Sequence, residues 1–169
     1  MPLLDVSKLK MNRGERVDFQ CREKLPPLPV EGEDIKPTQE VEYRLSLTNA
    51  DNAIVVDGII KVDLLVQCNR CLDSFVYPME AQLQETYYDC NLPQSGDKQP
   101  DWVPFSGDQI DIAPEVTQTI LVNLPMRFIC REDCRGLCSV CGVDLNNNQC
   151  QCPRDELDPR LAKLKDLLN

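Results

Sequence analysis

Apolar and polar residues alternate along much of the first half of the chain. The pattern runs through VEYRLSLTN (41–49) and IIKVDLLVQC (59–68), and continues in SFVYPMEAQLQETYYDC (74–90) after a short break. A period of two is typical of strands that bury one face, and ADNAIVVDG offers a turn between the first two stretches. We therefore predict an antiparallel meander over 40–88, and a further strand in RVDFQCRE (16–23).

Two stretches lack this alternation and are rich in turn residues. We predict a linker or loop in KLPPLPVEGEDIKP (24–37), because its prolines remove ladder hydrogen bonds and its acidic side chains favour water. Residues 89–109 have several glycines and prolines around Trp102, which predicts an irregular acidic loop.

A helical period follows this loop. In IDIAPEVTQTILVNLP (110–125), the apolar residues Ile112, Val116, Ile120 and Leu124 recur every four positions. Asp111 is a candidate cap and Pro125 ends the run, which predicts a helix near 112–124. A second helix is predicted to begin at Asp158, and its apolar face would consist of Leu161, Leu164, Leu167 and Leu168.

Together these elements predict an α+β fold. It consists of a mainly antiparallel β-sheet with one packing helix, a C-terminal Cys-rich zinc-knuckle module and a terminal helix. We expect a β-rich domain over 1–129, a metal-binding module over 130–153 and the terminal helix over 154–169. With 169 residues, the chain is long enough for one domain with a substantial core.

The chain has ten cysteines and no histidine. We found neither a secretory leader nor an apolar run of about 18 residues, so we expect a cytoplasmic protein without a membrane span. Cytosolic thiols stay reduced, and a dense cysteine pattern there indicates metal binding or catalysis more often than disulfides. A disulfide framework would require export of the chain.

The densest cysteine pattern is CREDCRGLCSVCGVDLNNNQCQC (130–152). Gly142 can take the turn after a Cys-x-x-Cys pair, and Asn146, Asn147 and Asn148 can reverse the chain toward a later Cys-x-Cys pair. This predicts a four-thiolate knuckle of Cys138, Cys141, Cys150 and Cys152. So short a segment cannot order itself by apolar packing, and metal binding would organise it.

Four further cysteines suggest a second site. Cys68 and Cys71 lie between two predicted strands, and Cys130 and Cys134 begin the cysteine-rich stretch. If these segments meet in space, the eight cysteines divide into two sets of four. The alternative is that Cys68 and Cys71 lie in a hairpin without metal. Cys21 and Cys90 have no spaced partner, and we expect them to be buried or partly buried thiols.

We expect one or two structural zinc ions, with iron as the less favoured metal. The spacing Cys134-x-x-x-Cys138-x-x-Cys141 is that of radical S-adenosylmethionine enzymes, but these need a large α/β barrel that this chain is too short to form. A rubredoxin-like iron site stays open, because four thiolates accept either metal. A thiol or iron redox protein is therefore the alternative function.

Catalysis has little support in the sequence. Without histidine there is no Cys-His or Ser-His-Asp system, so we expect no enzyme activity. A magnesium-dependent nuclease is the weakest hypothesis and would use Asp108, Asp111 and Glu115.

Charge narrows the choice of partners. The net charge is −10, and the acidic excess falls in residues 25–125, so the middle of the chain should repel phosphate and attract basic proteins. Local RNA contact could come from Arg127, Arg131 and Arg135. A second basic region consists of Lys8, Lys10, Arg13, Arg16, Arg22 and Lys24. For both basic regions, the alternative is ordinary ion pairing. Aromatic side chains could stack on RNA bases, and the alternative for them is core packing; they are Tyr87, Tyr88 and Trp102.

Three stretches together resemble the YceD-like family, the large ribosomal RNA subunit accumulation proteins. They are CNRCLDSFVYPMEAQLQETY (68–87), IDIAPEVTQTILVNLPM (110–126) and the cysteine-rich stretch 130–152. The likeness covers about residues 40–152. It implies a bacterial or plastid factor needed for accumulation or processing of large-subunit ribosomal RNA, generally regarded as metal-binding and without an established enzyme activity. The matching positions are Cys68, Cys71, Cys130, Cys134, Cys138, Cys141, Cys150 and Cys152.

We therefore expect a non-enzymatic ribosome-biogenesis factor with no small-molecule substrate and no membrane partner. Its partner would be a large-subunit ribosomal protein, precursor large-subunit (23S) ribosomal RNA, or both. The acidic middle of the chain favours a basic ribosomal protein slightly, because opposite charge speeds encounter.

Overall fold

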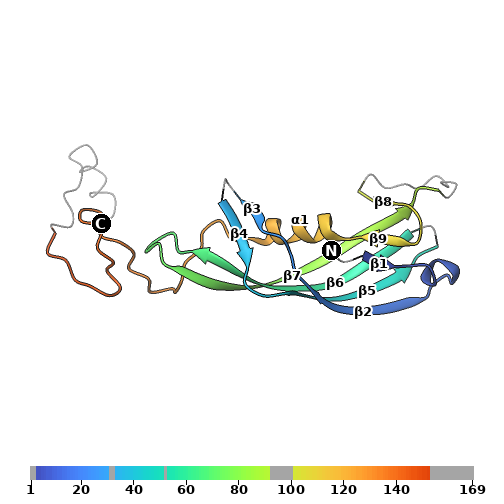
Figure 1. Ribbon diagram of the computed structural model, residues 1–169, viewed down its shortest axis with the longest axis horizontal. Coiled ribbons are helices and arrows are strands. Elements are labelled where there is room, and N and C mark those ends of the chain that lie inside the picture. Colours follow the sequence, from blue (N-terminus) through green and yellow to red (C-terminus); the bar gives the residue numbers. More distant parts are fainter. Residues whose placement is uncertain (1–2, 31–32, 52, 92–100, 153–169) are drawn as a thin grey trace, which may run out of the picture.

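The computed structural model describes residues 3–30, 33–51, 53–91 and 101–152. In chain order its elements are β1 (Leu3–Asp5), a 3-10 helix η1 (Leu9–Met11), β2 (Arg16–Glu23), β3 (Leu28–Val30), β4 (Glu33–Pro37), β5 (Val41–Asn49), β6 (Ala53–Gln67), β7 (Ser74–Asp89), β8 (Val103–Phe105), β9 (Gln109–Asp111) and α1 (Ala113–Asn123). Figure 1 shows a long curved sheet with α1 lying along it.

The predicted antiparallel meander is confirmed as β5, β6 and β7, and the predicted first strand is β2, antiparallel to β5. β7 pairs with β6 along its whole length, whereas the other edge of β6 pairs first with β5 and then with β4. Gly58 lies where the backbones of β6 and β5 approach closely. A Cβ added at this position would lie 2.1 Å from the Arg44 carbonyl oxygen. The close pairing therefore requires glycine at this position.

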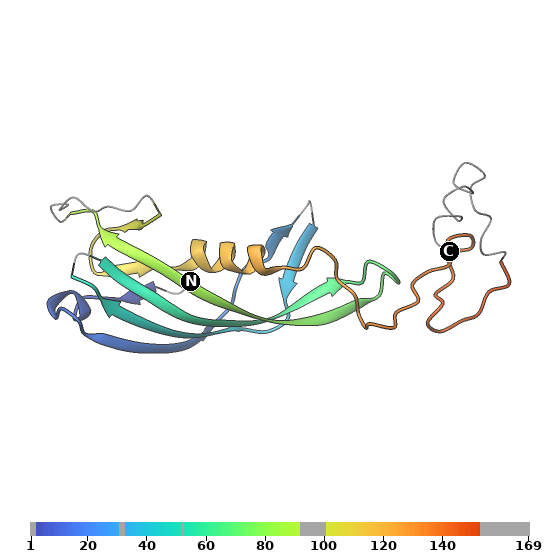
Figure 2. The same cartoon turned by 180° about the vertical axis from the view of Figure 1, so that it is seen from behind.

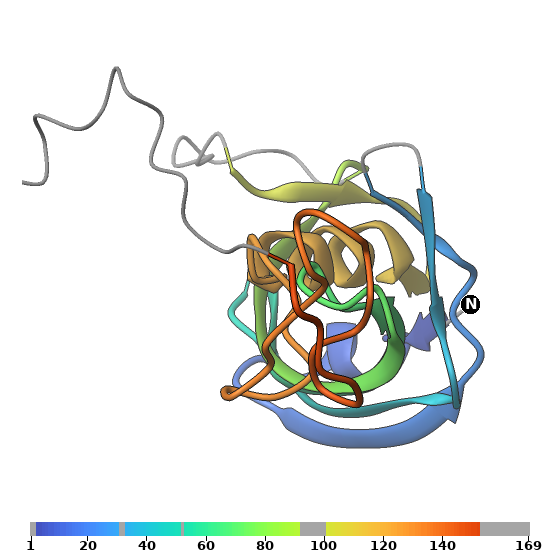
Figure 3. The ribbon, with the colours of Figure 1, turned by 90° about the vertical axis from the view of Figure 1, so that its left-hand side faces the viewer.

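The core lies between the concave face of the sheet and α1. Seen along the long axis, the sheet curls around the helix (Figure 3). Val116 and Ile120 of α1 and Leu64 and Leu83 of the sheet are fully buried in one cluster. The helix packs mainly on β7. The helix occupies the predicted region. Its cap residue is Ile112 and not Asp111 as predicted, although the Asp111 carboxylate accepts the Ala113 N–H at 2.9 Å.

The prediction of a linker or loop over 24–37 is confirmed for residues 24–27 and is wrong for the two strands that follow. β3 and β4 form an antiparallel hairpin in which Leu28 faces Ile35, and both side chains are buried. Among the described strands β3 pairs with β4 alone, so Pro29 is tolerated at an edge, and Pro37 is tolerated because it ends β4. The turn residues outnumbered the few apolar ones in the sequence, but those apolar residues fill one end of the core.

The prediction of an irregular loop over 89–109 is wrong at its described ends. β8 pairs parallel with β7, and β9 pairs antiparallel with β1, the first described strand. Strands this short have no clear period of their own, since distant partners form them. Residues 92–100 lie outside the described residues, and so does the helix predicted to begin at Asp158.

After α1 the chain leaves the sheet beside the β6–β7 turn, and residues 130–152 extend beyond that end of the molecule (Figure 2). All of residues 130–152 are described, and they consist of turns and extended segments with one isolated bridge between Leu137 and Asp144. The proposed domain boundaries at 129/130 and 153/154 stay a prediction. Of the described helices, none is long and apolar enough to cross a membrane.

Candidate metal centres

Four cysteines meet at the turn between β6 and β7. This hairpin group consists of Cys68 and Cys71 from the turn, and Cys130 and Cys134 from the chain after α1. Their sulfurs all lie within 4.8 Å of one another, with Cys68 Sγ 3.9 Å from Cys134 Sγ and Cys71 Sγ 3.7 Å from Cys130 Sγ. A disulfide needs about 2.05 Å. Four sulfurs about 2.3 Å from a central zinc ion would be about 3.8 Å apart, so the group fits a tetrahedral thiolate site.

Local contacts fix the hairpin group in place. Leu72 takes a positive φ of 64° in the turn, and its N–H donates to the Cys68 carbonyl at 2.9 Å. Asn69 holds the incoming chain, because its side-chain oxygen accepts the Phe128 N–H at 2.7 Å and its own N–H donates to the Phe128 carbonyl at 2.8 Å. The Phe128 ring also packs edge-on against Tyr77. These contacts bring two distant cysteine pairs together.

Backbone donors favour the charged form of Cys68. Burial raises the pKa of this thiol, but hydrogen bonds from backbone N–H groups, that of Cys130 first, outweigh burial and lower the pKa to about 6. The Asp73 N–H favours the Cys71 thiolate, yet burial and the neighbouring thiols together raise the pKa of Cys71. Burial and Cys68 raise the pKa of Cys130 as well. One negative charge in the group therefore opposes a second, and a divalent cation would relieve that repulsion.

The remaining spaced cysteines form a second group farther from the sheet. This distal group is Cys138, Cys141, Cys150 and Cys152, whose sulfurs also lie within 4.8 Å of one another. As predicted, Gly142 takes the turn after the first pair: its φ is +72° and its N–H donates to the Cys138 carbonyl at 2.9 Å. Cys138 is buried and Cys141 is exposed.

The electrostatics of the distal group resemble those of the hairpin group. Backbone N–H groups of Cys141 and Val140 lower the pKa of Cys138 to about 6. The Cys141 thiol, and then burial, raise the pKa of Cys152 to about 12. Each group thus has one thiol that ionises readily and a partner that resists ionisation. Either group could hold a metal ion, whose identity the sulfur ligands alone do not determine.

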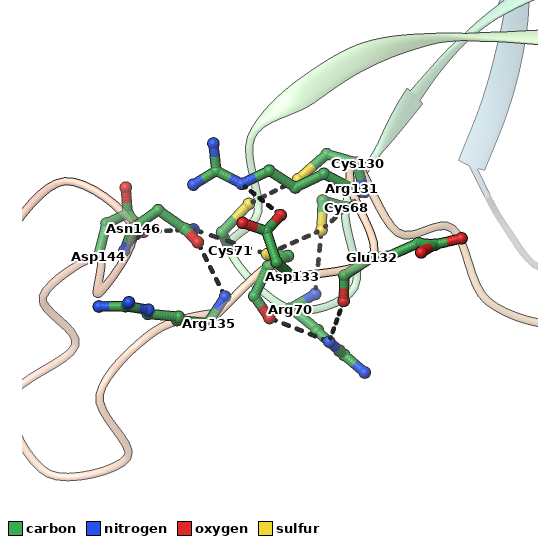
Figure 4. A network of polar contacts seen from close by, with 11 residues as sticks. Cys68, Arg70, Cys71, Cys130, Arg131, Glu132, Asp133, Arg135, Asp144 and Asn146 are labelled. Atoms are coloured by element: carbon green, nitrogen blue, oxygen red, sulfur yellow. Dashed lines mark hydrogen bonds and ion pairs between the residues drawn. The ribbon is translucent and has the colours of Figure 1, made fainter.

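Arg70 and Asn146 both contact the hairpin group, which the sequence pattern did not predict. The Arg70 guanidinium Nη1 donates to the Cys134 carbonyl at 2.9 Å, and Asn146 Nδ2 lies 3.6 Å from Cys134 Sγ (Figure 4). Arg70 stands between two cysteines in the sequence, which was the one available signal. The sequence contains no local signal that relates Asn146 to Cys134, because Asn146 lies in the loop of the distal group and Cys134 belongs to the hairpin group.

The arginines considered for RNA contact are all exposed. Arg131 and Arg135 lie beside the hairpin group, and Arg127 is on the segment that leads to it (Figure 4 labels the first two). Arg131 forms an ion pair with Asp133 at 3.5 Å. Their role in binding nucleic acid stays a prediction.

Other candidates from the sequence are engaged elsewhere. Four cations of the second basic region pair with acids, at distances of 2.6 Å for Lys10–Asp89, 3.2 Å for Arg13–Asp51, 3.6 Å for Arg16–Asp18 and 3.4 Å for Arg22–Glu42. Tyr87 is buried and donates to Glu115, so it belongs to the core. Tyr88 and Trp102 are half-buried.

The structure gives no support to the nuclease hypothesis and contradicts the expected burial of Cys90. Within the described residues, the groups of three or more candidate metal ligands are the two cysteine groups, and Asp108, Asp111 and Glu115 do not form one. Asp111 instead accepts a hydrogen bond at the start of α1. Cys90 is exposed rather than buried because it follows the last residue of β7, whereas Cys21 within β2 is half-buried as expected.

Comparison with known proteins agrees with the cysteine pattern. A family model described as large ribosomal RNA subunit accumulation protein YceD matches residues 56–168, which contain both cysteine groups. The chain belongs to the YceD family. No solved structure matches the chain.

Relatives of this YceD chain come from bacteria and plants. An uncharacterised protein of Mycobacterium tuberculosis is 26% identical over 129 residues, covering 76% of this chain and 62% of the relative. Two chloroplastic proteins named large ribosomal RNA subunit accumulation protein YCED homolog 1 are 23% identical over 154 residues in Arabidopsis thaliana and 33% over 150 residues in Zea mays. The matches cover 75% and 71% of this chain, respectively. The chain spans about half of the length of these relatives, 48% of the first and 51% of the second.

Proposed function

We propose that this chain is a non-enzymatic factor in biogenesis of the large ribosomal subunit, and that it supports accumulation or processing of large-subunit ribosomal RNA. The observation that carries the proposal is the YceD family match over residues 56–168. Plant relatives named for the same role support it. The ribosomal role of the whole protein is part of the proposal, because the chain spans only part of these relatives.

Two structural zinc ions, one in each cysteine group, complete the proposal. Four thiolates close the coordination shell of zinc and leave no open position for water or substrate, which is typical of structural sites. The sulfur separations of 3.7 and 3.9 Å in the hairpin group support such a shell. Residues 130–152 have few regular backbone hydrogen bonds of their own, so zinc would supply much of their stability.

A thiol or iron redox protein is the second candidate, favoured by the same sulfur geometry, because four thiolates also accept iron. Metal analysis of untagged protein, purified anaerobically under reducing conditions, separates the two. The zinc proposal expects a colourless protein with about two zinc ions per chain. A coloured protein with a reversible one-electron couple would support the redox candidate instead.

We propose a basic large-subunit ribosomal protein as the main partner. The net charge is −10, and the acidic excess falls in residues 25–125, which include most of the sheet and α1. Such a concentration of negative charge suits a cationic protein. Precursor ribosomal RNA is the alternative contact, through Arg127, Arg131 and Arg135, and crosslinking in cells distinguishes the two.

Deletion of the gene tests the ribosomal role. We expect precursor large-subunit RNA to accumulate and the mature RNA and the large subunit to decrease, as measured by RNA blotting and gradient sedimentation. A variant with both Cys68→Ser and Cys71→Ser should fail to restore them. A matched control with Cys21→Ser and Cys90→Ser should restore them fully, since neither residue belongs to a cysteine group. Unchanged precursor and mature RNA in the deletion strain would overturn the proposal.

A further inference from the structure

The two cysteine groups contact each other through Asn146. This residue lies in the loop between the two cysteine pairs of the distal group, yet its side chain reaches the hairpin group (Figure 4). Its Nδ2 lies 3.6 Å from Cys134 Sγ, and its Oδ1 accepts the Arg135 N–H at 2.8 Å. Asp144 orients it, because one carboxylate oxygen accepts both the backbone N–H and the side-chain Nδ2 of Asn146, at 2.9 and 2.8 Å.

The backbone forms a second connection. The carbonyl of Arg70, which lies in the turn between Cys68 and Cys71, accepts the N–H of Leu137 at 3.0 Å, and Leu137 precedes the first cysteine of the distal group. Gly136 makes this approach possible: its φ is +69°, and an added Cβ would lie 2.8 Å from the Arg70 carbonyl oxygen. The Gly136 carbonyl in turn accepts the Leu145 N–H at 2.9 Å, next to Asn146. The loop of one group is therefore docked on the other.

We propose that the two cysteine groups are energetically coupled metal sites, with Asn146 as the positioning residue that couples them. The proposal rests on the metal binding described under the proposed function. An N–H donor stabilises the negative charge of a metal-bound thiolate, and Asn146 supplies one to Cys134 from the other site's loop. An ion in the distal group holds that loop in place, so binding at either site favours binding at the other, by the same factor in both directions.

The loop offers a matched control. Asn147 is adjacent to Asn146 and also bonds Asp144, with its Nδ2 2.6 Å from Asp144 Oδ2. No contact of Asn147 with the hairpin group is recorded among the described residues. Asn147→Ala therefore tests general damage to the loop, whereas Asn146→Ala tests its connection to Cys134. Asn146→Asp keeps an acceptor for the Arg135 N–H and loses the N–H directed at sulfur, but it also loses the donor to Asp144 and adds a negative charge beside that carboxylate.

The experiment is a zinc competition titration of the full chain against a chromophoric chelator under anaerobic conditions. The distal site is disabled by Cys150→Ser with Cys152→Ser. We expect this change to weaken zinc binding at the hairpin group about tenfold, and Asn146→Ala or Asn146→Asp in the intact chain to do the same. In the chain with the disabled distal site, Asn146→Ala should reduce the zinc affinity of the hairpin group little further. Asn147→Ala should leave that affinity unchanged in both the intact and the disabled chain.

Cobalt substitution supplies a second readout that loop damage alone would not move. With both sites loaded, Asn146→Asp should shift the sulfur-to-cobalt charge-transfer absorption, because one ligand thiolate loses its hydrogen bond, and Asn147→Ala should not. Independent affinities at the two sites, or Asn146→Asp behaving like the parent chain, would overturn the coupling alone. A parent chain that binds no metal would overturn both the coupling and the proposed zinc sites.

Discussion

Tyr87 is the residue where burial and charge conflict most clearly. Its side chain is buried, and its hydroxyl donates to Glu115 Oε2 at 3.1 Å. Burial, and then the Glu115 charge, raise the pKa of this hydroxyl well above its usual value. Glu85 lies near the same carboxylate, and burial and Glu115 raise its pKa too. Two carboxylates thus share a partly desolvated site with the Tyr87 hydroxyl, and the raised pKa of Glu85 means that its negative charge costs stability at neutral pH.

Replacing Glu85 by glutamine should stabilise the protein at neutral pH. The folded state holds the Glu85 proton more tightly than the unfolded chain does, so the stability of the parent falls as the pH rises through the raised pKa. Glu85→Gln should therefore gain about 0.5 kcal/mol at pH 7. The gain should vanish below the ordinary glutamate pKa of 4.5, where the parent is protonated in both states.

Urea unfolding of Glu85→Gln and the parent at pH 7 and in acid measures this difference. Glu40→Gln is the control, because Glu40 is exposed in the short segment between β4 and β5. It should change the free energy of unfolding little at either pH. A Glu85→Gln variant that is less stable than the parent at pH 7 would show that the negative charge is needed there.

In the long elements, the period of apolar residues predicted which face is buried. The inward residues of β5, Val41, Tyr43, Leu45 and Leu47, are buried at every second position, as their alternation predicted. The apolar period of α1 likewise places Val116 and Ile120 on the sheet. Periodicity worked for these long elements because burial on one face repeats at the period of the backbone. It failed for β3, β4, β8 and β9, which are too short to show a period, and β8 and β9 also depend on partners that are distant in the sequence.

Within α1, the buried and exposed faces should differ sharply in their tolerance of truncation. Ile120→Ala should destabilise the protein by about 2–5 kcal/mol, because Ile120 is 0% exposed and its loss leaves a cavity against the sheet. Val122→Ala should change stability by less than about 0.5 kcal/mol, since Val122 is 77% exposed. Chemical unfolding compares the two variants, and equal losses would place α1 differently on the sheet.

At the scale of the whole molecule, two kinds of stabilisation meet at the β6–β7 turn. The sheet and α1 share one apolar core. The smaller hydrophobic cluster beyond it consists of Cys68, Cys71 and Cys134, with Phe75 and Cys130 packed against it. So small a cluster buries little apolar area, so the cysteine end must depend on other interactions. This division predicts separate responses to heat and to removal of metal.

Chelation of metal should therefore unfold one end of the molecule and spare the other. With a strong chelator and reductant, we expect amide hydrogen exchange in residues 130–152 to rise to nearly unprotected rates, because the proposed metal ions would supply much of the stability of that segment. Exchange in β5 and β6 should stay slow, and the β-sheet circular dichroism should persist. Protection of 130–152 that is unchanged after complete metal removal would contradict a structural role for the ion.

The sequence by itself determined the long strands, the helix and the pairing of cysteines within each local motif. These follow from backbone periods and from the few residues that a Cys-x-x-Cys turn needs. Only the tertiary structure decided that Cys134 joins Cys68, 66 positions earlier, rather than the cysteines that follow it. It also decided that Asn146 contacts Cys134 and that Leu28 and Ile35 belong to the core. The physical reason is that local geometry depends on neighbouring residues, whereas these contacts exist only after packing brings distant segments together.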